Sequence, residues 1–127
     1  MGDGMKPQHS GLASGRWKKM TLSEQMANIG SEVSRALNWR NKGNEEYSRK
    51  AAVRALELID LSLDCMESLP RLREVARLRE TVVDFFWGDN QFASSEALWR
   101  AYFDHFNHAA RNARPHQSKP SIARRLR

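Results

Sequence analysis

The chain has 127 residues with a hydrophobic fraction of 40%, which is typical of one globular domain with its own core. No apolar run approaches the roughly 20 residues of a membrane-spanning helix, and the N-terminal residues lack the apolar segment of a secretory signal. A single cysteine, Cys65, excludes an intramolecular disulfide and a thiolate-rich metal site. We therefore expect a soluble, cytoplasmic protein with no membrane association, no metal and no other cofactor.

The formal net charge of +6 is distributed unevenly along the chain. Residues 1–19 carry +3 and residues 111–127 carry +6, whereas residues 20–110 carry −3. Both ends are poor in large apolar residues and contain Gly, Ser and Pro, so burial would not offset the entropy lost on ordering. We predict a flexible basic arm over residues 1–20 and a disordered basic tail over residues 113–127.

The first predicted helix begins after Thr21 and ends before Gly43. Thr21 and Glu24 have the spacing of a capping box, and a glycine after the last turn is a common helix stop. Apolar residues in this segment recur every three or four positions, namely at Leu22, Met26, Ile29, Val33 and Leu37. This period predicts an amphipathic helix with a narrow apolar stripe.

Residues 45–67 are predicted to form the central helix, because their apolar positions cover more than one stripe. One stripe contains Ala51, Ala55, Leu58 and Ser62, and the adjacent one contains Ala52, Leu56, Ile59 and Leu63. A helix that is apolar over most of its circumference normally lies inside a bundle. Asn44 is a suitable N-cap, and the short connection predicts that the first two helices are antiparallel neighbours.

Two further helices are predicted, over residues 71–87 and 96–112. Ser68 and Pro70 suit the start of the first, and Gly88 its end; Ser94 or Ser95 suits the start of the second. Four helices with short connections predict an all-α, antiparallel up-and-down four-helix bundle over residues 21–112.

The last two predicted helices and the loop between them are rich in aromatic residues: Phe85, Phe86, Trp87, Phe92, Trp99, Tyr102, Phe103 and Phe106. Aromatic residues at helical spacing usually fill a core, which is the interpretation we favour. The alternative is that part of this aromatic face binds a protein partner or forms a homodimer.

Arg100 and His105 are separated by four residues in the last predicted helix. An Arg-x4-His spacing in the last helix of a four-helix bundle resembles the HEPN (higher eukaryotes and prokaryotes nucleotide-binding) family. The resemblance implies a metal-independent endoribonuclease, often dimeric, of the toxin or defence type. Arg100 would then stabilise charge on the phosphate, and His105 would act as general acid or base. The structural alternative is a solvated Arg100 and a His105 packed at the edge of the core.

Basic residues near the two ends indicate a different function, in which phosphates are bound without sequence specificity. The candidates are Lys18, Lys19, Arg111, Arg114, Lys119, Arg124, Arg125 and Arg127. Trp17 would add a stacking contact with a base, and the arginines of residues 71–79 add positive charge. The leading hypothesis is a small, non-enzymatic protein that binds RNA or DNA or serves as a subunit of a larger assembly. The ribonuclease and a protein-protein adaptor are the alternatives, so enzymatic activity is left open.

Overall fold

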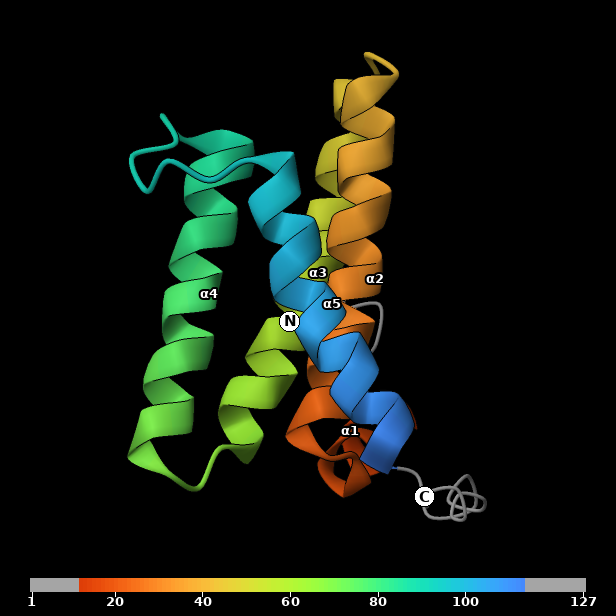
Figure 1. Cartoon of the computed structure of the whole chain (residues 1–127), viewed down its shortest axis with the longest axis vertical. Coiled ribbons are helices and arrows are strands. Elements are labelled where there is room, and N and C mark those ends of the chain that lie inside the picture. Colours follow the sequence, from red (N-terminus) through yellow and green to blue (C-terminus); the bar gives the residue numbers. More distant parts are fainter. Residues whose placement is uncertain (1–11, 114–127) are drawn as a thin grey trace, which may run out of the picture.

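The computed structural model describes residues 12–113, which form five α-helices and no strand. The helices are α1 (Leu12–Lys19), α2 (Leu22–Asn41), α3 (Glu45–Cys65), α4 (Leu69–Trp87) and α5 (Glu96–Ala113) (Figure 1). The predicted all-α class is confirmed, and the described residues contain one helix more than the four expected. None of the described helices is both long and apolar enough to cross a membrane.

The polar residues at the predicted helix starts act as caps. Thr21 accepts a hydrogen bond from the backbone N–H of Glu24 at 3.1 Å, and the Glu24 carboxylate accepts from the N–H of Thr21 at 2.9 Å. The side chains of Asn44 and Ser68 cap α3 and α4 by accepting a hydrogen bond from the N–H of Tyr47 and of Arg71, respectively. For α5, the structure decides between the two candidate serines, since Ser95 accepts from the third residue of the helix. Local sequence therefore sets the starts of α2 to α5.

The turn between α2 and α3 is a Schellman motif centred on Gly43. Gly43 has a φ of 79°, which is the left-handed region that glycine adopts without steric cost. Its N–H donates to the carbonyl of Arg40, and the N–H of Asn44 donates to the carbonyl of Trp39, both at 3.0 Å. This turn leads the chain into α3, which lies beside α2.

Helix α1 corrects the predicted flexible arm over residues 12–19. Its aromatic residue, Trp17, is 3% exposed and belongs to the core. Trp17 Nε1 donates to Ser62 Oγ at 2.9 Å, and the Trp17 carbonyl accepts from Gln25 Nε2 at 2.9 Å. Packing against α2 and α3 stabilises this short helix, which its own sequence would not do. Residues 1–11 of the predicted arm and residues 114–127 of the predicted tail lie outside the described residues.

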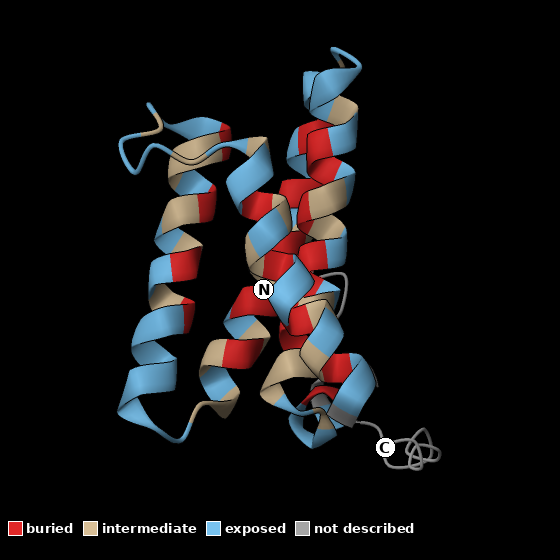
Figure 2. Ribbon diagram, viewed as in Figure 1, coloured by how far each residue is buried: buried red, intermediate tan, exposed pale blue. Residues whose placement is uncertain are grey.

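The core lies between helices, with buried residues facing inward along each of them (Figure 2). Helix α2 contacts both α3 and α5, whereas α3 contacts α2, α4 and α1. The expectation that residues 45–67 form a single central helix is therefore too simple, because α2 and α3 share the centre. Helix α2 reaches α5 closely at Gly30, where an added Cβ would lie 2.6 Å from the ring of Phe103.

Helix α4 packs against α3 but stands away from α5 over much of its length (Figure 1). Arg40 of α2 holds the C-terminal end of α4: its guanidinium lies 4.3 Å from the ring centroid of Phe85 and donates to the Phe85 carbonyl at 3.3 Å. The loop after α4 then returns the chain to α5. A groove lined by side chains of α4 and α5 lies between these two helices.

Candidate functional site

Arg100 lies in the first turns of α5 and binds residues of α2. Its Nη1 donates to Ser34 Oγ at 2.9 Å, and its Nη2 donates to Asn38 Oδ1 at 3.0 Å. Its Nε donates to Glu96 Oε2 at 2.9 Å, and a 2.8 Å ion pair joins the same two side chains. All three guanidinium nitrogens therefore have partners within the chain, and the side chain is neither buried nor freely solvated.

Glu96 completes this cluster by connecting Arg100 to a third residue of α2. Its Oε1 accepts from Asn41 Nδ2 at 2.9 Å. The Asn41 amide and then the Arg100 guanidinium hold the pKa of the Glu96 carboxyl below its usual value. The cluster of Ser34, Asn38, Asn41, Glu96 and Arg100 thus joins α5 to α2 through charge-assisted hydrogen bonds.

His105, the other residue of the HEPN-like motif, lies elsewhere on the same helix. Its ring is exposed and contacts Phe106 edge-on at a centroid distance of 5.1 Å. Five residues along an α-helix correspond to a rotation of about 140° beyond one full turn, so the two side chains leave the helix in different directions. Within the described residues, no hydrogen bond or ring contact joins His105 to Arg100. The catalytic roles of both residues stay a prediction.

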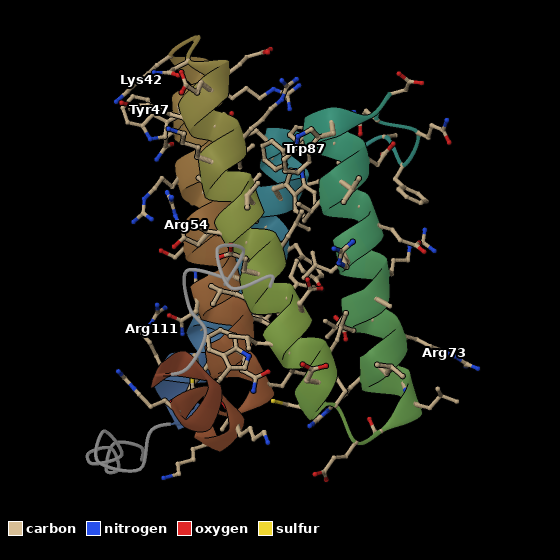
Figure 3. All side chains as sticks on the ribbon, turned by 180° about the vertical axis from the view of Figure 1, so that it is seen from behind. Lys42, Tyr47, Arg54, Arg73, Trp87 and Arg111 are labelled. Carbon is tan, nitrogen blue, oxygen red and sulfur yellow. The ribbon has the colours of Figure 1, made fainter. Side chains whose placement is uncertain are left out.

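Three of the candidate phosphate-binding residues lie within the described part of the chain. Lys18 and Lys19 are exposed at the C-terminal end of α1, and Arg111 is exposed in the last turn of α5. These helix ends lie at the same end of the molecule, opposite Lys42 at the turn between α2 and α3 (Figure 3). None of the three forms an ion pair with another described residue. Arg114, Lys119, Arg124, Arg125 and Arg127 lie outside the described residues.

The stacking contact expected of Trp17 does not agree with its position. The indole ring is buried in the core and its Nε1–H is used by Ser62, so the ring has no free face for a nucleic-acid base. The neighbouring Lys18 and Lys19 point to solvent, because they follow Trp17 on a different side of the helix. Any contribution of α1 to binding would be electrostatic.

The aromatic residues of α4 and α5 are divided between core and surface. Phe86, Trp99, Phe103 and Phe106 are buried, in agreement with the interpretation that we favoured. Trp87 and Phe92 are 40% and 44% exposed. The buried indole N–H of Trp99 has no hydrogen-bond partner among the residues that the structure describes, which is uncommon in a protein interior.

The groove between α4 and α5 has no counterpart among the features predicted from the sequence. Its volume is about 650 Å³, and it is lined by Arg73, Glu74, Arg77, Leu78, Thr81, Ser94, Leu98, Trp99, Ala101 and Tyr102. The sequence shows Leu98 as one more apolar residue of the last helix. Only in the structure is this side chain 60% exposed, which marks it as part of a surface and not of the core. Only the separation of the two helices, which periodicity does not give, makes this surface concave.

Neither similarity to a known protein nor a group of metal ligands assigns a function to these sites. No family model matches the chain, and neither the curated proteins nor the solved structures contain a significant match. Within the described residues, no three His, Cys, Asp or Glu side chains are grouped closely enough to hold a metal ion. The candidate sites are therefore defined by the geometry alone.

Proposed function

We propose that this chain is a non-enzymatic protein that binds RNA or DNA through a basic surface at one end of the molecule. In this proposal α2 to α5 form an antiparallel up-and-down bundle that serves as the scaffold. The observation that supports it is the position of Lys18, Lys19 and Arg111, which are exposed at the same end of the structure.

The sequence that follows α5 is also basic. Residues 114–127 continue directly from the last turn of that helix and contain five Arg or Lys residues and no acid. Lysine and arginine side chains on such a segment and on α1 would neutralise phosphates of one bound strand. Binding of this kind is independent of sequence and weakens steeply with salt, because condensed counterions are released from the nucleic acid.

Fluorescence anisotropy with a labelled single-stranded RNA, and with a DNA duplex, tests the proposal over a series of salt concentrations. Binding weakens with salt, so the slope of log K against log salt is negative. Substituting Lys18, Lys19 and Arg111 by glutamine should reduce the magnitude of this slope by about 2 for the single strand, since each lost contact contributes about 0.7. The matched control replaces Lys42, Arg49 and Lys50 at the opposite end by glutamine. Equal losses in the two variants would mean that net charge, and no particular surface, governs binding.

The contribution of the C-terminal residues is tested separately in the full-length chain. Glutamine at positions 114, 119, 124, 125 and 127 should reduce affinity and salt dependence further. Retention of full affinity in both sets of variants would refute the proposal. Binding that disappears only with the second set would assign the function to the C-terminal residues alone.

The ribonuclease suggested by Arg100 and His105 is a separate hypothesis that the same RNA tests. Cleavage in excess EDTA is measured for the intact protein and for His105→Ala. His105 is the more informative position, because it is exposed and its replacement leaves the core unchanged. Arg100→Ala would remove the contacts with Ser34 and Asn38, so a loss of activity there would not separate catalysis from folding. Chelator-resistant cleavage that His105→Ala abolishes would support the HEPN-like mechanism.

A further inference from the structure

The groove between α4 and α5 has two different walls. The wall on the α5 side is built from Leu98, Trp99, Ala101 and Tyr102 of that helix and from Ser94 of the preceding loop, and none of these residues is charged. The α4 wall carries two arginines, Arg73 and Arg77, on either side of a single acid. A concave surface of about 650 Å³ with mostly apolar walls is of the size that encloses a bound group.

The acid of the α4 wall is already engaged. Glu74 Oε2 accepts a hydrogen bond from the Tyr102 hydroxyl at 3.1 Å, which links the two walls. Burial, together with the Glu74 carboxylate, raises the pKa of the Tyr102 hydroxyl, so the hydroxyl stays protonated and keeps donating at neutral pH. The negative charge of Glu74 therefore has a local partner.

The two arginines of this wall have no carboxylate partner within the described residues. Arg73 is exposed and lines the groove, and Figure 3 shows its side chain extending outward from α4, away from α3. Arg77 lies over the ring of Phe92 at 5.0 Å. Because they are four residues apart, they repeat along α4 at a spacing of about 6 Å. A ligand with two carboxylates at the same spacing would match both.

We propose that this groove binds an amphipathic α-helix of a partner protein, with carboxylates along the side that faces α4. The apolar stripe of that helix would cover Leu98, which is 60% exposed, and fill the space above Trp99. Its acidic residues, spaced by one helical turn, would pair with Arg73 and Arg77. This is the helix-in-groove mode of recognition, in which apolar side chains supply affinity and charges set the orientation. It is separate from the nucleic-acid binding proposed for Lys18, Lys19 and Arg111, none of which lines this groove.

The probe is a synthetic amphipathic peptide with a leucine stripe and glutamates at i, i+4 on one flank. Isothermal titration calorimetry with the full-length protein should detect binding, and a peptide with lysine in place of each glutamate should bind at least about tenfold more weakly. Reversing the charge of both arginines, Arg73→Glu with Arg77→Glu, should invert this preference. Failure of the glutamate peptide to bind at millimolar concentration would overturn the proposal, as would an unchanged preference in the reversed variant.

A second pair of variants tests the apolar part of the groove. Leu98→Glu should abolish peptide binding, whereas Val53→Glu should not, since Val53 is a comparable exposed apolar residue that does not line the groove. Both positions are on helix surfaces, and circular dichroism verifies the fold of each variant. Equal effects of the two substitutions would contradict the assignment. A homodimer in sedimentation velocity that Leu98→Glu dissociates would identify a second copy of this chain as the occupant and replace the proposed partner.

Discussion

Trp17 of α1 donates a hydrogen bond from Nε1 to Ser62 Oγ of α3 at 2.9 Å, across 45 positions of the sequence. Both side chains are buried, Ser62 completely. The indole also belongs to the main hydrophobic core. The basic segment that contains Lys18 and Lys19 is therefore held in place by an aromatic residue, and its charges project from a fixed position on the surface.

Two buried tryptophans should respond differently to substitution by phenylalanine. Trp17→Phe removes a hydrogen bond and leaves the buried Ser62 hydroxyl without that partner, whereas Trp99→Phe removes an indole N–H that has no partner. We expect Trp17→Phe to cost about 1–2 kcal/mol more of unfolding free energy than Trp99→Phe. Urea unfolding followed by circular dichroism measures both. A smaller cost for Trp17→Phe would contradict the docking of α1.

Two helical glycines should give opposite results when each is replaced by alanine. At Gly30 the new Cβ would lie within 2.6–2.8 Å of three atoms of Phe103, so α5 must move away from α2. We expect a net destabilisation of about 1–3 kcal/mol. At Gly15 the new Cβ would meet no other part of the described structure within 4 Å, so Gly15→Ala should stabilise α1 by up to about 1 kcal/mol through helix propensity.

The Gly30 prediction has its own control for steric cause. Phe103→Ala removes two of the three contacting atoms, Cγ and Cδ1. In the Gly30→Ala background it should therefore cost less stability than it does in the wild type. Thermal unfolding of the four proteins gives the coupling energy directly. Additive effects of the two substitutions would show that the contact does not limit the approach of α2 and α5.

Much of this fold is predictable from the sequence, because several helix ends carry local signals. The capping box of Thr21 with Glu24, the caps at Asn44 and Ser68, and the stop at Gly43 all acted as expected. These signals depend on residues within one turn of each other, so tertiary packing does not override them.

Helix α1 and the environment of Arg100 could not be predicted in this way. The segment of α1 is polar apart from a few residues, and its order depends on contacts between Trp17, Gln25 and Ser62 that are distant in sequence. Similarly, the period of α5 shows that Arg100 is near a helix surface but does not show that Ser34 and Asn38 of α2 lie opposite it. Both features require the relative placement of helices, which one sequence does not provide.

The contribution of Glu96 to stability should depend on pH. Because the Asn41 amide and Arg100 lower the pKa of this carboxyl in the folded state, its stabilising effect is complete above the unfolded pKa of about 4.3. It is lost as the pH falls through the lower folded pKa. The difference in unfolding free energy between wild type and Glu96→Gln should therefore shrink on acidification from pH 5 toward pH 3.

Urea titrations at several pH values measure this difference, with Glu46→Gln as the control for removing one acid. Glu46 forms an exposed pair with Lys50 on a single helix, at 3.4 Å, and connects no two helices. A difference for Glu96→Gln that is constant from pH 3 to pH 7 would contradict the described cluster.

The loop between α4 and α5 contains two residues with positive φ, and glycine should have opposite effects at them. Asn90 has a φ of 55° and Ala93 a φ of 57°. An alanine in this region is strained by about 1–2 kcal/mol, so Ala93→Gly should stabilise the protein by about 0.5–1 kcal/mol after the greater entropy of unfolded glycine is included. Asparagine tolerates a positive φ better than alanine does, and the Asn90 side chain forms hydrogen bonds that glycine could not form.

The Asn90 side chain closes this loop through Ser94. Its Oδ1 accepts from the Ser94 N–H at 2.8 Å, and its Nδ2 donates to the Ser94 carbonyl at 2.9 Å. Asn90→Gly should therefore destabilise by about 1–2 kcal/mol despite its favourable backbone, because two hydrogen bonds are lost. Thermal unfolding of the two variants measures both signs. Stabilisation by Asn90→Gly would show that backbone strain, and not the Asn90 side chain, determines the conformation of the loop that precedes α5.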